Sequence, residues 1–149
     1  MSMIEYILSE WEKDCIIDDM RLDESSRETP RLHAKYLAIF SKTRLLGKKL
    51  EMDRKNLLKD KWLYYNGKMT KDDMDNFGWK YDPFDGMNKP LKTDMDHYYG
   101  TDKDIQNQQL KIDYNKELQD TLKEVMDNIK WRHQTIKNMI EWRKFTSGA

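Results

Sequence analysis

The residues that decide the fold are 118–143, LQDTLKEVMDNIKWRHQTIKNMIEWR. A seam runs through this stretch at spacings of 4-3-4-3-4-3-4, and its members are Leu118, Leu122, Val125, Ile129, Arg132, Ile136, Met139 and Arg143. Alternating spacings of three and four place side chains on one face of an α-helix. The seam therefore predicts one helix from Thr101 or Asp102 to about Phe145. Two of its eight positions are arginine, which is more typical of an assembly interface with polar layers than of a simple dimeric zipper.

The first two-fifths of the chain predict further helices. A short helix is expected from about Met3 to Cys15, and a second one from about Leu22 to Glu28. Pro30 suits the first turn of a third helix, with Thr29 as its cap, that ends near Gly67. Along this third helix apolar residues again recur at spacings that fit a 3-4 pattern, at Leu32, Tyr36, Ile39, Leu46, Leu50, Leu57 and Tyr64.

Residues 68–92 read as a loop or linker. Gly and Pro residues punctuate it, with Asp and Asn between them. It also carries four aromatic residues, so we expect it to dock rather than remain free coil, and a helical turn is expected over about Thr93–Tyr99. The sequence thus predicts an all-α protein in three regions: 1–67, helical; 68–100, a loop with aromatics; and 101–149, a coiled-coil-like oligomerisation helix.

The composition favours helices that need partners. Hydrophobic residues make up 38% of the 149 residues and charged residues 36%, against about 45–50% and about 25% in typical proteins. Such a chain has too little apolar material for a thick monomeric core. It suits long helices that bury narrow stripes against each other or against copies of themselves.

Several function classes find no support in the sequence. The single cysteine, Cys15, fits a reducing compartment, and neither a signal peptide nor a long apolar run is present, so we expect a soluble intracellular protein without membrane contact. His33, His97 and His133 lack metal-ligand spacing, and no phosphate-binding glycine loop occurs. No catalytic residue, metal or cofactor is therefore predicted.

Charge is unevenly distributed although the net charge is zero. Residues 42–71 hold 10 basic and 3 acidic residues, net +7, whereas residues 1–30 hold 3 basic and 9 acidic residues, net −6, and residues 72–104 hold 4 basic and 9 acidic residues, net −5. One strongly basic stretch therefore lies between two acidic ones, and it is the place to look for an anionic partner.

The end of this basic stretch interleaves cations with aromatic rings. Cations bind backbone phosphates and flat rings stack on exposed bases, which is the combination that single-strand binders use. The region 1–67 is therefore expected to bind DNA. The candidate DNA-binding residues are Arg54, Lys55, Lys59, Lys61, Trp62, Tyr64, Tyr65 and Lys68. The alternative is a solvated helix face with Trp62 and Tyr64 in the core and lysine stems covering apolar surface.

Three stretches together resemble the UvsY family, the recombination mediators of tailed bacteriophages. They are LSEWEKD with IID at residues 8–14 and 16–18, LKDKWLYYNGK at residues 58–68, and IEWRKFTSGA at residues 140–149. The resemblance runs in order over nearly the whole chain. Its most specific parts are Tyr-Tyr-x-Gly followed by a basic residue, and the terminal Trp-Arg-Lys-Phe.

This resemblance implies a helical protein that forms a ring-like homo-oligomer of six or seven subunits through its C-terminal part, in the cytoplasm of a bacterial host. It implies single-stranded DNA, the phage single-strand-binding protein and a UvsX-like recombinase as partners. The family's DNA-contacting basic pair maps onto Lys59 and Lys61. Family members can carry Arg at the second position, and Lys there lacks the bidentate fork.

Two questions stay open at the level of sequence. Six apolar residues of the C-terminal helix are expected between subunits, with packing inside one subunit as the alternative: Leu118, Leu122, Val125, Ile129, Ile136 and Ile140. A coiled-coil scaffold without nucleic-acid binding is the competing function, and no residue excludes RNA in place of DNA.

Overall fold

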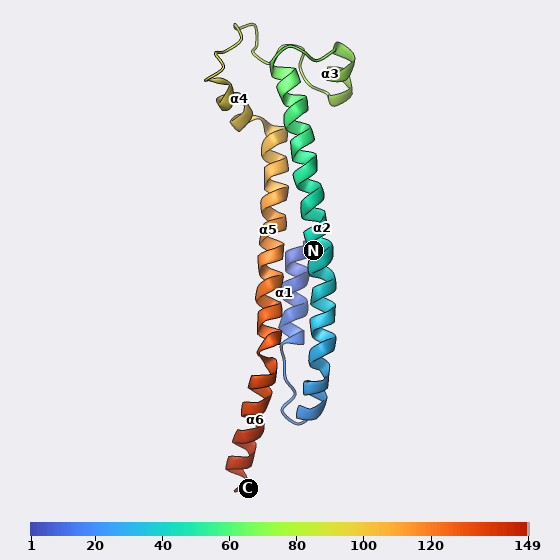
Figure 1. The fold of residues 1–149 in the computed structure, drawn as a ribbon, viewed down its shortest axis with the longest axis vertical. Coiled ribbons are helices and arrows are strands. Elements are labelled where there is room, and N and C mark those ends of the chain that lie inside the picture. The colour runs from blue at the N-terminus through green and yellow to red at the C-terminus, as the bar shows by residue number, and fades with distance from the viewer. Residues whose placement is uncertain (149) are drawn as a thin grey trace. The chain divides into compact units, whose positions relative to one another are not determined.

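The computed structural model describes residues 1–148, and every regular element in them is an α-helix (Figure 1). In chain order these are α1 (Met3–Asp14), α2 (Leu22–Tyr65), α3 (Lys71–Phe77), α4 (Met95–Thr101), α5 (Lys103–Lys130) and α6 (Arg132–Thr146). The all-α prediction is confirmed for the described residues. No helix within them combines the length and the apolar content needed to span a lipid bilayer.

The helices form two compact units. Unit 1 consists of Met1–Leu46 and Asn115–Ala149, and unit 2 of Gly47–Tyr114. These units differ from the three consecutive regions expected from the sequence. The reason is that the two long helices, α2 and α5, pair with each other, so each contributes one part to each unit.

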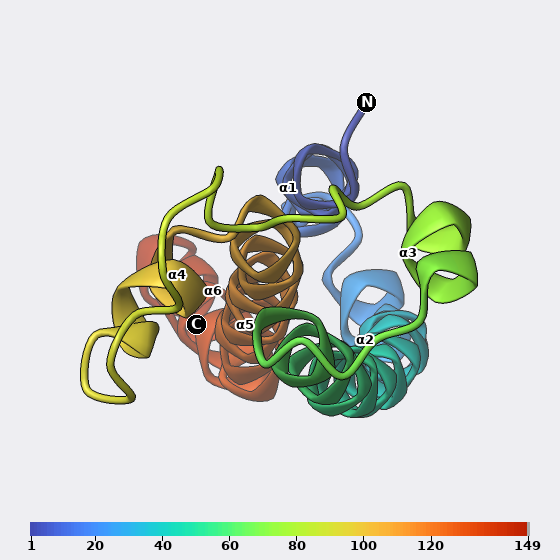
Figure 2. The same cartoon turned by 90° about the horizontal axis from the view of Figure 1, so that it is seen from above.

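Unit 1 is built around one apolar cluster. In Figures 1 and 2, α1 lies beside α2 and α5. The buried members of the cluster come from these three helices and are Ile7, Leu32, Tyr36, Leu118, Leu122, Val125 and Ile129. The Ser2 and Glu5 side chains cap the start of α1 reciprocally. The Tyr36 hydroxyl donates to Asp14 at the end of that helix over 2.8 Å, which ties α1 to α2.

The seam of α5 therefore packs inside the chain. Leu118, Leu122, Val125 and Ile129 contact residues of α1 and α2, and Ile136 in α6 is also buried. For these residues the expected placement between subunits is replaced by the alternative, packing within one subunit. The sequence predicts helix α1 but does not indicate that these residues pack against it. Ile140 is partly exposed and remains a candidate for contact with another copy.

One continuous helix, α2, replaces the two helices expected over about Leu22–Glu28 and from Pro30 to near Gly67. Helix α2 continues through Pro30, because Leu22 and Ser25 on the turns before it are buried and hold those turns in place. The hydrogen bond that proline cannot donate would have gone to the Ser26 carbonyl, on an exposed residue that water can reach. Thr29 accordingly lies inside the helix and does not cap it.

The predicted C-terminal helix is two helices. α5 and α6 meet at Trp131, whose N–H is shared between the carbonyls of Asp127 (3.3 Å) and Asn128 (3.2 Å). The next side chain, Arg132, is buried and donates to the Ser25 carbonyl over 3.2 Å. We attribute the interruption to this long-range anchor, since the sequence at the junction contains neither proline nor glycine.

Helix α3 was not predicted at all. Thr70 caps it by accepting from the Asp73 N–H over 3.2 Å, and Gly78 ends it in the left-handed region at φ 73°. Both signals are present in the sequence, although the surrounding glycines and prolines suggested only a loop. The turn expected near Thr93–Tyr99 is confirmed as α4.

Candidate nucleic-acid interface

The exposed cations of unit 2 form a line along α2. Lys48, Lys55 and Lys59 are all exposed, and Trp62 follows on the same face with 46% of its surface exposed. Their spacings of seven, four and three residues keep them on one side of the helix. We call these four residues the α2 stripe. Lys49 and Lys68 are exposed nearby, whereas Arg54 is only partly exposed.

Lys61 lies on the opposite, buried side of the same helix. Only 4% of its surface is exposed, and its ammonium is 2.9 Å from Asp102 Oδ2 and 2.8 Å from Asp104 Oδ2. It also lies 3.8 Å from the ring centroid of Trp79. A lysine held by two carboxylates and an aromatic ring is not free to bind a phosphate.

The carboxylates around Lys61 are held by further groups. The Tyr65 hydroxyl donates to Asp102 Oδ2 over 2.7 Å, and the Trp79 indole N–H donates to Asp104 over 2.9 Å. Asp102 Oδ1 accepts from the Ile105 N–H over 3.0 Å and so caps α5. This network fastens the segment after α2, and the start of α5, to the end of α2.

The network changes the acidity of its members. Burial raises the pKa of Asp102, but the hydrogen bonds from Tyr65 and Lys61 outweigh it, and the pKa lies below its ordinary value. Burial and the bond to Asp102 together raise the pKa of the Tyr65 hydroxyl. Asp102 is therefore charged at neutral pH and Tyr65 is a neutral donor.

The aromatic residues divide between core and surface. Tyr64 and Tyr65 are buried with Met74 and Met95, and Trp79, Phe84, Tyr98 and Tyr99 pack against them. Tyr64 follows the alternative stated for it, packing in the core, whereas Trp62 does not. The expectation of an exposed DNA-binding surface is therefore corrected for Lys61, Tyr64 and Tyr65.

A sequence signal could have shown this division. Lys61 follows Leu57 by four residues and precedes Tyr64 by three, which places it on the apolar face of the helix. Lys55, Lys59, Lys68 and Trp62 remain as exposed candidates. Whether they bind DNA stays a prediction.

Unit 2 also contains a groove that sequence reasoning missed. It has a volume of about 660 Å³. Its lining comes from the end of α2, from residues 89–92 and from α4, and consists of Trp62, Asn66, Lys89, Pro90, Leu91, Lys92, Met95, Asp96 and Tyr99. We call it the Trp62 groove. In the sequence, only Lys-Pro-Leu-Lys at residues 89–92 indicates cations near this groove. Where that segment packs on the protein cannot be predicted from its residues.

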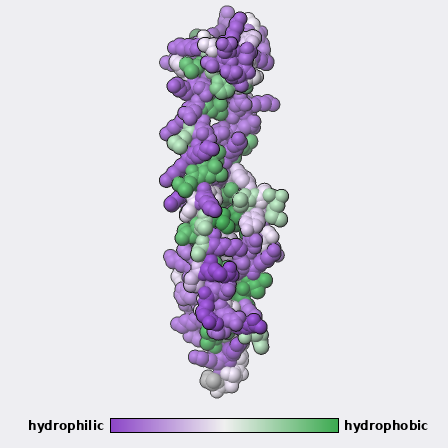
Figure 3. All heavy atoms as spheres, turned by 90° about the vertical axis from the view of Figure 1, so that its right-hand side faces the viewer, coloured by the Kyte–Doolittle hydropathy of each residue, from purple (hydrophilic) through white to green (hydrophobic). Residues whose placement is uncertain are grey.

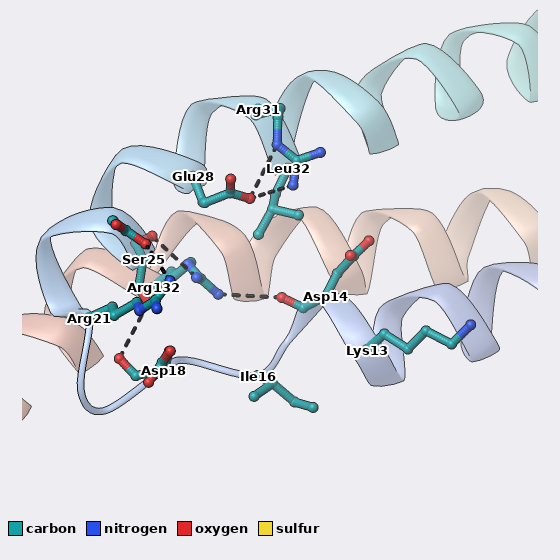
Figure 4. A pocket seen from close by; sticks show the side chains of 11 residues that line it. Lys13, Asp14, Ile16, Asp18, Arg21, Ser25, Glu28, Arg31, Leu32 and Arg132 are labelled. Atoms are coloured by element: carbon teal, nitrogen blue, oxygen red, sulfur yellow. Dashed lines mark hydrogen bonds and ion pairs between the residues drawn. The ribbon is translucent and has the colours of Figure 1, made fainter.

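A smaller pocket lies in unit 1 (Figure 4). It has a volume of about 390 Å³ and is lined by both charge types in equal number: Lys13, Arg21, Arg31 and Arg132 against Asp14, Asp18, Glu24 and Glu28. Arg31 pairs with Glu28, and Arg132 donates to backbone carbonyls. This balance favours a structural role. Among residues 1–148, no group of three or more side chains has the makeup of a metal site.

A family model described as "Recombination, repair and ssDNA binding protein UvsY" matches residues 10–149. The chain belongs to the UvsY family. This confirms the resemblance noted in the sequence. The description of this family covers recombination, repair and the binding of single-stranded DNA.

Individual relatives agree in sequence and in fold. The recombination protein uvsY of Enterobacteria phage T4 is 27% identical over 145 residues, which cover 97% of this chain and 98% of that protein. A crystal structure of the bacteriophage T4 recombination mediator protein UvsY (lattice type II) matches with a TM-score of 0.80 at 25% identity, over 99% of this chain and 98% of that one. The lattice type I structure gives 0.79 at 25% identity, over 93% and 97%.

Proposed function

We propose that this chain binds single-stranded DNA along the α2 stripe and acts as a recombination mediator. The observation that carries the proposal is the line of exposed residues Lys48, Lys55, Lys59 and Trp62 on one helix face. Three cations on one side of a helix can follow one phosphate backbone, and the ring at the end offers a surface for a base. Membership of the family supplies the nucleic-acid class.

The mediator role has a defined sequence of partners. The chain would bind DNA covered by the phage single-strand-binding protein, help to displace that protein, and help to load a UvsX-like recombinase onto the exposed strand. No step of this sequence requires a bond to be made or broken by this chain. Energy from nucleotide hydrolysis would belong to the recombinase.

Self-association would compensate for the zero net charge of the chain. Three stripe lysines per subunit are few, but several copies on one strand multiply the contacts without new chemistry. Helix α6 carries large exposed apolar side chains suited to contact between copies, namely Trp142 at 66%, Phe145 at 74% and the partly exposed Ile140. Figure 3 shows hydrophobic side chains, in green, on an otherwise hydrophilic face of the molecule. A ring of six or seven subunits is the assembly that the family resemblance suggests.

The test is a fluorescence-anisotropy titration of a labelled single-stranded oligonucleotide over a range of salt concentrations. Each phosphate neutralised on a single strand contributes about −0.7 to the slope of log K against log salt, so three lysines give roughly −2 per engaged subunit. Lys59→Ala is expected to weaken binding and to reduce that slope by about 0.7 per subunit.

A matched control is Lys116→Ala, which removes an exposed lysine from α5 in unit 1. It is expected to leave both the affinity and the slope unchanged. If the two substitutions weaken DNA binding equally, the net charge of the chain, and not the α2 stripe, determines the affinity. A folded, oligomeric protein that binds no oligonucleotide at low salt would favour the scaffold function, and tighter binding of a matched RNA would change the partner.

A further inference from the structure

We propose that the Trp62 groove holds one unstacked base of the bound strand, so that the segment after α2 is part of the DNA site. This inference deepens the proposed function and rests on it. The volume of about 660 Å³ lies within the range of about 300–1,000 Å³ that small-ligand sites occupy. The lining combines aromatic, apolar, cationic and hydrogen-bonding groups, which are the kinds that a nucleotide requires.

Trp62 provides the stacking surface. It is the largest aromatic ring in the lining and is 46% exposed, although the neighbouring Tyr64 and Tyr65 are buried. The ammonium of Lys68 lies 4.6 Å from its ring centroid. Because this ammonium lies over one face of the indole, a base would stack on the other face, with a cation close to the phosphates on either side of it.

Residues 89–99 provide the opposite wall and its charges. Lys89 donates to Asn66 Oδ1 over 2.8 Å, which fixes the position of its ammonium beside the end of α2. Asn66 itself donates to the Trp62 carbonyl over 2.8 Å, so its amide is held at the rim. Lys92 adds a second exposed cation.

The one carboxylate in the lining, Asp96, favours a base over a bare phosphate. A carboxylate repels a phosphate but accepts hydrogen bonds from the N–H groups of bases, which include the ring N3–H of thymine. Two lining lysines against one aspartate leave the groove with a net charge of +1. The cations therefore suit the flanking phosphates, and Asp96 suits the base between them.

Continuity with the α2 stripe identifies the occupant as DNA. Trp62 belongs to both features, because it ends the stripe and lines the groove. A strand that follows Lys55 and Lys59 along α2 reaches the groove next. A peptide or a free nucleotide would fit the groove equally well in size, but only a longer anionic strand explains why the line of lysines leads into it.

The experiment compares two probes of equal length and phosphate number, an oligo(dT) and a fully abasic oligonucleotide. The protein is expected to bind the oligo(dT) about 5- to 150-fold more tightly for each base that stacks in this way. Trp62→Ala should weaken the binding of the oligo(dT) by this factor more than that of the abasic strand, and so remove the preference between the two probes. Trp62→Phe should keep part of it, because a smaller ring still stacks.

A lysine pair separates the groove from general charge. Lys89→Ala with Lys92→Ala should weaken the binding of both probes, whereas Lys80→Ala, an exposed loop lysine outside the lining, should weaken neither. Photo-crosslinking of the unsubstituted protein to an oligonucleotide with 5-iodouracil should place adducts at Trp62 or Tyr99. This measurement does not depend on how any variant folds.

Each result decides between the two proposals. If Trp62→Ala weakens both probes equally, or if crosslinks form only outside the lining, the groove does not hold a base and the inference is wrong. If the unsubstituted protein binds neither probe, the proposed function itself fails. If it binds both probes alike, DNA binding stands and the base-binding groove does not.

Discussion

Replacing Lys61 with methionine is expected to destabilise the protein before it affects DNA contact. Methionine keeps much of the side-chain volume but leaves Asp102, which is 8% exposed, without its ammonium partner. Breaking a buried ion pair by removing one partner costs about 3–5 kcal/mol. Asp104 adds little to that figure because its side chain is 50% exposed and regains water. For a chain of this length, the loss corresponds to a decrease of roughly 6–20 °C in the melting temperature.

The assay pairs thermal unfolding, followed by circular dichroism, with DNA titration at a temperature where each variant is folded. Lys59→Met is the matched control, since Lys59 is exposed and its loss should change the free energy of unfolding by no more than about 0.5 kcal/mol. Lys59→Met should instead lose DNA affinity. A double variant, Lys61→Met with Asp102→Asn, should recover part of the lost stability because no buried charge remains unpaired.

One result would refute this reasoning. If Lys61→Met melts at the temperature of the unsubstituted protein and loses as much DNA affinity as Lys59→Met, then its ammonium is available to DNA and the ion pair with Asp102 does not hold it. Full recovery of DNA affinity in the Lys61→Met, Asp102→Asn variant would instead show that Lys61 acts by positioning the segment that follows α2.

Three further results are expected. The free energy of unfolding should fall as the pH drops below about 4, because Asp14 and Asp102 have lowered pKa values in the folded protein and their stabilisation is lost on protonation. Acid titration followed by circular dichroism checks this. A constant stability down to about pH 2 would contradict it. Leu122→Ala should cost about 2–5 kcal/mol in urea unfolding, since Leu122 is fully buried in the unit 1 cluster. Trp142→Ala combined with Phe145→Ala should reduce the sedimentation coefficient of any oligomer without changing helix content; an unchanged oligomer would remove α6 from the proposed interface.

Helix positions could be predicted from the sequence wherever local periodicity and packing agree. The seam at Leu118, Leu122, Val125 and Ile129 gave both the helix and its buried face. The seam did not predict which element packs against that face. A narrow apolar stripe packs equally well against a copy or against its own chain, and the choice depended on how α1 lies against α2 and α5. The break at Trp131 likewise depends on a contact between Arg132 and Ser25, which are far apart in sequence.

The candidate site could be predicted only in part for a similar reason. Residue type identified cations and rings near the end of α2, but burial depends on what covers the helix. Of the covering residues, Trp79 comes from a segment rich in turn residues, and Asp102 and Asp104 come from the start of α5, whose position depends on that segment. The residues of such a segment predict where its turns lie, but not where the segment packs against the rest of the protein. Lys89 and Lys92 became visible as site candidates only once that return path was known.

The roles of Lys59 and Lys61 follow from helix geometry as much as from burial. Residues two positions apart on an α-helix are separated by about 200° around its axis, so they do not share a face. A strand that follows Lys55 and Lys59 along one side of α2 cannot also reach Lys61 while the helix stays regular. The two lysines of a basic pair at this spacing therefore make different contacts. Lys59 is the member that can meet phosphate, and Lys61 is the member that holds Asp102, Asp104 and Trp79 against the helix. A loss of DNA binding on substitution of either lysine would thus arise from two different causes.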